Sequence, residues 1–149
     1  MPVEISRLGA GRKYPTAGLR LIARELLILL KQERAELSIA LVGDQEMRPL
    51  NAKYRRKNRT TDVLSFFVTD RPKAAPALLG DVIISVEQAR RQAKAGQQTL
   101  NVEMATLLIH GVLHLLGYDH ERSERQAKRM FALERKLFAC LCERGLLKL

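Results

Sequence analysis

The spacing of apolar residues along this chain predicts about five helices. Between residues 17 and 35 the apolar positions recur every three or four residues, which is the period of an amphipathic helix. Similar spacing predicts helices at 45–57, 87–95 and 100–116, and a last helix after a capping box at 123–126. The last helix is expected to bury one face: Ala127, Met130, Phe131, Leu133, Leu137, Phe138 and Leu141.

Short runs of β-favouring residues predict strands between these helices, at 3–5, 37–42, 63–68 and 81–86. The last two runs follow each other without an intervening helix, so we expect them to pair antiparallel across a loop at 69–79. The predicted fold class is therefore α+β. It is an α/β sandwich in the broad sense, with a small mixed sheet of three to four strands covered by the helices.

The stretch from Leu100 to Leu116 is apolar at nearly every position. A helix that is apolar on all sides is a buried helix, so this one is expected at the centre of the fold. Its few polar residues share one narrow stripe at helical spacing: Glu103, Thr106, His110, His114 and, at the end, Gly117. Because buried polar groups need partners, we expect this stripe of polar residues to face a binding partner.

All three histidines of the chain lie in or just after this helix. His110 and His114 are four residues apart and therefore share a helix face. Gly117 can end the helix in a left-handed turn, so that the chain folds back and brings His120 to the same point. Three converging imidazoles suit one Zn²⁺ ion and leave a coordination position for water, although imidazole also suits nickel, copper and iron. The alternative of three separately hydrogen-bonded core histidines fits this spacing less well.

The histidine spacing matches the metzincin protease pattern, H-E-x-x-H-x-x-G-x-x-H, with one departure. Gly111 stands where those proteases have the glutamate that serves as general base. Peptide hydrolysis would lack its proton acceptor, whereas a metal would still lower the pKa of bound water to about 7. Phosphodiester cleavage depends more on charge stabilisation and positioning, so a nuclease is favoured. Asp119 is either a substitute acid or base or, as we favour, a residue that orients a histidine.

The charge of the chain points to a polyanionic partner. Lys and Arg number 26 against 16 Asp and Glu, a formal net charge of +10. Nucleic acid is the simplest partner, with an unspecific basic surface as the alternative. Residues 53–59 contain five cations and one tyrosine, which fits either a nucleic-acid contact or a solvated helix end.

Other features of the sequence predict a cytoplasmic protein without a membrane span. The first residues lack a secretory pattern, and no apolar segment reaches about 20 clean positions. Cys140 and Cys142 point to different faces of a helix and fit reduced thiols. No repeat and no long linker divides the chain, so residues 1–149 are predicted to form a single domain.

Three stretches together resemble the YbeY endoribonucleases, which are bacterial rRNA maturation factors. They are the histidine stretch 110–120, residues 50–55 (Leu-Asn-Ala-Lys-Tyr-Arg) followed by 61–66 (Thr-Asp-Val-Leu-Ser-Phe), and residues 79–85 (Leu-Gly-Asp-Val-Ile-Ile-Ser). With Leu-Val-Gly-Asp at 41–44, they run in the family's order. Two positions depart from the family: Phe67 replaces a frequent proline, and Pro49 interrupts the helix before Leu50.

This resemblance implies a metal-dependent endoribonuclease that cuts single-stranded RNA. It implies action in 16S rRNA 3′-end maturation and 70S ribosome quality control, with the small ribosomal subunit and its assembly factors as partners. It also implies zinc on His110, His114 and His120 and a functional Arg55, whose guanidinium can hold a phosphate by two hydrogen bonds. The alternative is a non-catalytic ribosome-assembly factor with a structural metal, which the absent base at Gly111 favours.

Overall fold

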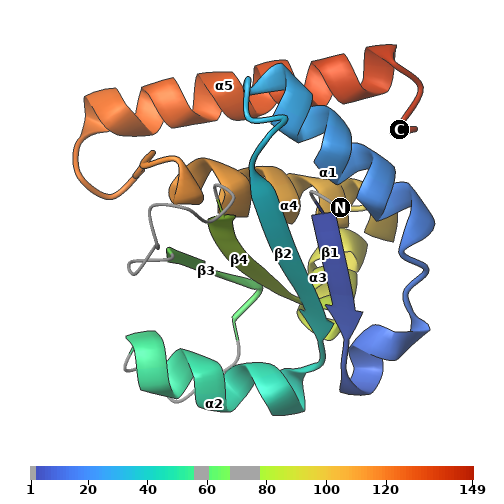
Figure 1. Cartoon of the computed structure of the whole chain (residues 1–149). Helices are drawn as coiled ribbons and strands as arrows, with labels where there is room; N and C mark the ends of the chain where they lie inside the picture. The colour runs from blue at the N-terminus through green and yellow to red at the C-terminus, as the bar shows by residue number, and fades with distance from the viewer. Residues whose placement is uncertain (1–2, 56–60, 68–77) are drawn as a thin grey trace.

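A computed structural model describes residues 3–55, 61–67 and 78–149, apart from the side chains at 54, 55 and 67. The described part of the chain contains four strands, a short 3₁₀ helix and five α-helices, the last three of which follow the last strand (Figure 1). The strands are β1 (Val3–Arg7), β2 (Glu36–Val42), β3 (Val63–Phe67) and β4 (Leu78–Ser85). The helices are the 3₁₀ helix η1 (Gly9–Lys13), α1 (Ala17–Leu29), α2 (Asp44–Arg55), α3 (Val86–Ala95), α4 (Leu100–Leu115) and α5 (Glu124–Glu143).

The four strands form one mixed sheet in the order β1-β2-β4-β3. β1 and β4 flank β2 and run parallel to it, while β3 pairs antiparallel with β4, as predicted. Parallel neighbours require a crossover connection, and α1 supplies the one between β1 and β2. The predicted α+β class, with a small mixed sheet covered by helices, is confirmed.

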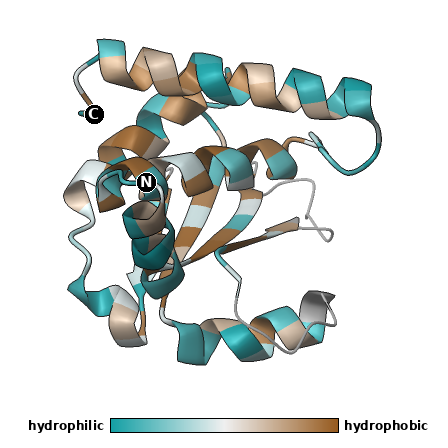
Figure 2. Cartoon of the chain, turned by 180° about the vertical axis from the view of Figure 1, so that it is seen from behind, coloured by the Kyte–Doolittle hydropathy of each residue, from teal (hydrophilic) through white to brown (hydrophobic). Residues whose placement is uncertain are grey.

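One face of the sheet forms the main core. Its buried side chains alternate along the strands and pack in one cluster with α1, α4 and α5: Val3, Leu37, Ile39, Leu41, Val82 and Ile84. In Figure 1, α4 lies behind the sheet, α5 crosses the top and α2 lies at the opposite end. Figure 2 shows predominantly hydrophobic strands, whereas α5 carries extended hydrophilic segments. The central position of α4 agrees with its apolar sequence.

The structure corrects several predicted boundaries. α1 ends at Leu29 rather than at 35, because Lys31 takes a left-handed conformation with φ 58° and turns the chain towards β2. β4 begins at Leu78, within the predicted loop, since this end pairs with β2 across a bulge between Glu36 and Leu37. Residues 9–13, which lie between the first predicted strand and the first predicted helix, form η1.

One of the residues predicted to lie on the buried face of α5 is exposed instead. Met130, Leu137 and Leu141 are buried as expected, but Phe131 is 45% exposed. The helix turns Phe131 out of the core, towards the edge that borders His120. One of the two hydrogen bonds of the predicted capping box is confirmed, because the Ser123 hydroxyl accepts a hydrogen bond from the backbone N–H of Gln126.

Gly111 lies where α4 approaches the sheet most closely. The Ser65 hydroxyl of β3 donates a hydrogen bond to the Gly111 carbonyl (3.1 Å), and a Cβ at this position would lie 2.7 Å from Val82 Cγ1. Val82 is fully buried, so it has no space into which to move. We therefore expect Gly111→Ala to lower the free energy of unfolding by about 1–3 kcal/mol in urea titrations.

Gly18 provides the matched control, because it also lies in a helix but a Cβ added there would meet nothing within 4 Å. Gly18→Ala is expected to raise stability by up to about 1 kcal/mol, since alanine favours helix. Equal effects of the two substitutions would contradict the proposed close packing at Gly111.

Candidate metal centre

The three histidines converge at one point of the structure. His110 and His114 project from the last turns of α4, and His120 lies in the segment between α4 and α5. Their ring centroids are 4.6, 5.2 and 5.5 Å apart in pairs. One nitrogen from each ring can be chosen so that all three lie within 4.8 Å of one another. The three residues are therefore placed to hold a metal ion.

The end of α4 brings His120 back to the helix. Gly117 has φ +97°, and its backbone N–H donates to the His114 carbonyl, while the N–H of Tyr118 donates to the Leu113 carbonyl. These two bonds form the Schellman motif, which favours glycine at the left-handed position. The predicted role of Gly117 as the helix-ending residue is confirmed.

The geometry of the cluster fits a small tetrahedral ion. His110 Nε2 and His114 Nε2 are 3.1 Å apart. Two nitrogens on one tetrahedral zinc are about 3.3 Å apart, because each lies about 2.0–2.1 Å from the ion. The third ring has a buried Nδ1 that has no hydrogen-bond partner within the described chain, and a bound cation would satisfy such an atom.

No fourth ligand completes the cluster among residues 3–55, 61–67 and 78–149, where the three histidines alone form the group. The histidine side chains are partly exposed, His110 by 25% and His120 by 33%. Structural zinc sites are closed by four protein ligands, whereas catalytic sites keep one position open. The described donor set has the three protein ligands that the second type uses.

Glu134 is a residue of the site that the sequence analysis missed. It lies on α5, and its Oε2 is 3.2 Å from His110 Nδ1, while its other oxygen is buried without a partner in the described structure. A carboxylate that accepts a hydrogen bond from Nδ1–H leaves Nε2 of the same ring as the metal-binding nitrogen. The sequence did carry a signal for this role, because Glu134 is an acid on the apolar face of the last helix, between Met130 and Leu137.

Asp119 does not take the orienting role that we favoured for it. Its Oδ1 accepts a hydrogen bond from the backbone N–H of Glu121 (2.9 Å), and its Oδ2 lies 3.4 Å from Arg122 Nε. These contacts shape the turn that carries His120. The carboxylate within hydrogen-bond distance of a histidine ring, in the described structure, is that of Glu134.

A cleft of about 790 Å³ opens in front of the histidines, between β3, α4 and α5. The predicted polar stripe of α4 lines it, from Glu103 through Thr106 to His110 and His114. Glu103 is bound at its own end of the cleft, where it accepts hydrogen bonds from Gln92 (3.0 Å) and Gln98. The stripe therefore has two functions: its first residue connects α4 to α3, and its last two approach the metal position.

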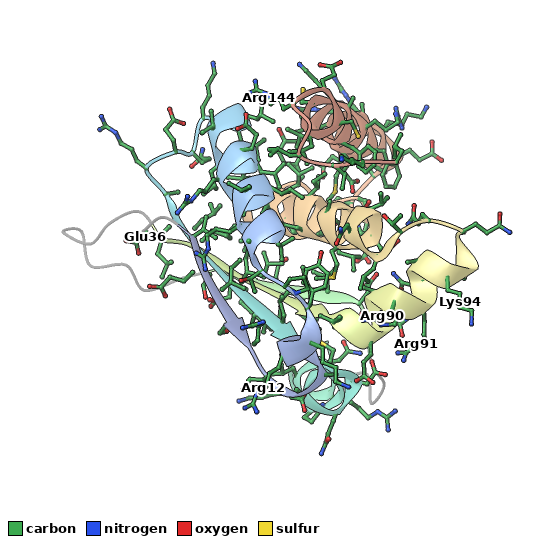
Figure 3. All side chains as sticks on the ribbon, turned by 90° about the vertical axis from the view of Figure 1, so that its right-hand side faces the viewer. Arg12, Glu36, Arg90, Arg91, Lys94 and Arg144 are labelled. Carbon is green, nitrogen blue, oxygen red and sulfur yellow. The ribbon has the colours of Figure 1, made fainter. Side chains whose placement is uncertain are left out.

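Arg55 is the last residue of α2, and its side chain lies outside the described structure. Most of the basic stretch 53–59 lies outside it too, so its predicted contacts with nucleic acid remain predictions. Other cations are described: Arg12, Arg90, Arg91 and Lys94 point outward from η1 and α3 in Figure 3. Arg91 is partly neutralised by Asp44, at 2.8 Å.

Fold and site together define an α+β protein with a histidine cluster that can hold a metal in an open cleft. The family model described as Endoribonuclease YbeY matches residues 12–141. The chain therefore belongs to the YbeY endoribonuclease family, as its motifs indicated. Within the described ranges no helix has the length and apolar character needed to cross a membrane.

Relatives match most of this chain. An Endoribonuclease YbeY from Geobacter metallireducens is 44% identical over 140 residues, covering 91% of this chain and 93% of the relative. One from Myxococcus xanthus is 50% identical over 140 residues, but this chain spans only 46% of its length. The solution structure of TM1509 from Thermotoga maritima superposes with a TM-score of 0.62 at 27% identity, covering 91% of this chain and 86% of that one.

Proposed function

We propose that this protein is a zinc-dependent endoribonuclease that cleaves single-stranded RNA. The observation that carries the proposal is a three-histidine cluster without a fourth described ligand, in an open cleft of a YbeY-family chain. The proposed substrates are ribosomal, at the 16S rRNA 3′ end and in 70S quality control. The proposed location is the cytoplasm, with the small ribosomal subunit and its assembly factors as partners. The net charge of +10 supports a polyanionic substrate.

His110, His114 and His120 would hold one zinc ion in this proposal. When bound, such an ion lowers the pKa of a water molecule towards about 7 and stabilises negative charge on phosphate oxygens. Glu134 keeps the His110 ring in place by accepting its Nδ1–H. In this proposal the RNA strand enters the cleft that the histidines line.

Arg55 is proposed to bind the scissile phosphate, on the basis of the family motif alone. Its guanidinium would hold two phosphate oxygens and stabilise the charge that develops on them during cleavage. Asp119 lines the cleft beside His120 and is a candidate for moving a proton to the leaving oxygen.

Arg55→Ala tests this assignment. We expect the variant to bind zinc normally and to cleave a single-stranded rRNA fragment about 10²–10³-fold more slowly, because it loses one preorganised donor to the transition state. Arg55→Lys is the matched variant, which keeps the charge but not the paired donors, and it should recover only part of the rate. Unchanged cleavage by Arg55→Ala would refute the role of this residue.

The alternative is a non-catalytic assembly factor with a structural metal. The missing base at Gly111 was its main support. A Cβ at that position would lie 2.7 Å from Val82 Cγ1 and 3.2 Å from Ser65 Oγ, so a glutamate there would require the sheet or the helix to shift. The absence of a glutamate thus has a packing reason that is independent of whether the protein is an enzyme.

A further inference from the structure

Phe131 is an exposed aromatic residue at the edge of the histidine cleft. It is 45% exposed, although it lies on a helix whose other face is part of the core. Its ring centroid is 6.3 Å from that of His120, with 37° between the ring planes. Single exposed apolar side chains are ordinary on a protein surface, so Phe131 is distinguished by its place beside His120 rather than by its exposure.

Two cations lie on the same side of α5 as Phe131. Lys128 precedes it by three residues and Arg135 follows it by four, so the helical period places all three along one stripe. Lys128 and Arg135 are exposed and have no ion pair or hydrogen bond with any described residue. The acid beside Arg135 in sequence, Glu134, is directed to His110 instead. The stripe is therefore an aromatic ring between two available positive charges.

We propose that this stripe binds the RNA strand, with one unpaired base stacked on Phe131 and the flanking phosphates on Lys128 and Arg135. The inference rests on the proposed nuclease function and adds a substrate contact to it. Aromatic rings bind every base through its π-face, and cations beside them follow the backbone. Because Phe131 adjoins His120, the stacked base belongs to a nucleotide next to the phosphate at the histidines.

This arrangement also gives a physical reason for a preference for single strands. A base inside a duplex is already stacked on both sides and cannot cover the Phe131 ring without being pulled out. An unpaired base can stack on the ring without that cost. The stripe thus selects unpaired RNA without reading a particular base.

The absence of tryptophan from the chain allows a direct test. Phe131→Trp introduces a single tryptophan at the proposed stacking position, and its fluorescence should be quenched by single-stranded oligouridylate and oligoadenylate but far less by duplex RNA. Leu21→Trp is the control, because Leu21 is similarly exposed, at 51%, but lies on α1 and has no contact with the histidines. Quenching at both positions, or at neither, would overturn the proposal.

Affinity measurements with the zinc-loaded protein provide a second test. Phe131→Ala should weaken binding of a single-stranded oligonucleotide roughly tenfold, while Phe131→Tyr should bind like the wild type. Zinc content should be the same in all three proteins. If Phe131→Ala binds and cleaves normally while the wild type cleaves RNA, the stacking inference fails and the proposed nuclease survives. If the wild type binds RNA through Phe131 but never cleaves it, the nuclease fails and the stacking contact survives.

The two cations are tested by salt dependence against a matched pair. The double variant Lys128→Ala/Arg135→Ala should lower the slope of log affinity against log salt by about 1.4, at about 0.7 per phosphate contact on a single strand. Arg90→Ala/Lys94→Ala removes the same charge from the exposed surface of α3, away from α5, and should change the slope far less. Equal slopes for both double variants would show that only net charge matters, which would contradict the stripe.

Discussion

His114→Ala is expected to abolish stoichiometric zinc binding and to lower RNA cleavage by more than about 10³-fold. The substitution leaves two nitrogens where three converge within 4.8 Å, and a site that keeps one position open has no spare protein ligand. The loss should exceed that of a single hydrogen-bond donor, which is about 10²–10³-fold, because the ion supports several steps of charge stabilisation. Zinc content of the purified protein and cleavage of a single-stranded rRNA fragment are the two measurements.

A double variant, Cys140→Ser/Cys142→Ser, serves as the control for metal content. Both cysteines are free thiols on α5, and neither belongs to the histidine cluster. We expect this variant to bind one zinc per chain and to cleave like the wild type. If His114→Ala retained zinc and the cysteine variant lost it, the metal would bind elsewhere. That result would contradict a metal site at the three histidines.

Stability measurements on the same proteins separate the nuclease from the assembly factor. α4 is anchored by fully buried side chains such as Met104, Leu108 and Leu113, which do not depend on a metal. Chelation of zinc is therefore expected to remove cleavage while the protein stays folded at room temperature, with its unfolding midpoint lowered by the lost binding free energy of the ion. A large fall in stability together with no detectable cleavage by the zinc-loaded protein would instead support the structural metal.

Glu134→Ala is expected to weaken zinc affinity about 100-fold, measured by competition with a chelator of known affinity. The wild-type carboxylate holds the His110 ring through Nδ1, at 3.2 Å, and adds negative charge near the cation. Glu134→Gln keeps a hydrogen-bond acceptor but removes the charge, so a smaller loss of about tenfold is expected. A zinc affinity that falls from the wild type to Glu134→Gln and further to Glu134→Ala would show that this carboxylate orients the histidine.

Glu143→Gln is the matched control for the loss of an acid from α5, since Glu143 is exposed at the other end of the same helix. Its zinc affinity should equal that of the wild type. If Glu134→Ala also binds zinc as tightly as the wild type, the contact with His110 has no part in holding the metal.

Local spacing in the sequence was sufficient to predict several parts of this protein. The four-residue separation of His110 and His114 places them on one helix face, and a glycine at 117 permits the left-handed turn that returns His120. The apolar surroundings of these residues predicted a buried helix with one polar stripe. Each of these inferences concerns residues within a few turns of one another, where helix geometry alone relates the side chains.

Contacts between distant segments could not be predicted from local spacing and became visible in the folded chain. Glu134 reaches His110 because α5 packs across α4, and Gly111 is required because β3 and β4 pass beneath that helix. Phe131 fits the apolar pattern of α5, but the axis and rotation of the docked helix turn it towards His120 instead of the core. The physical reason is that periodicity relates residues on one element, whereas the angle and distance between elements follow from the packing of the whole core.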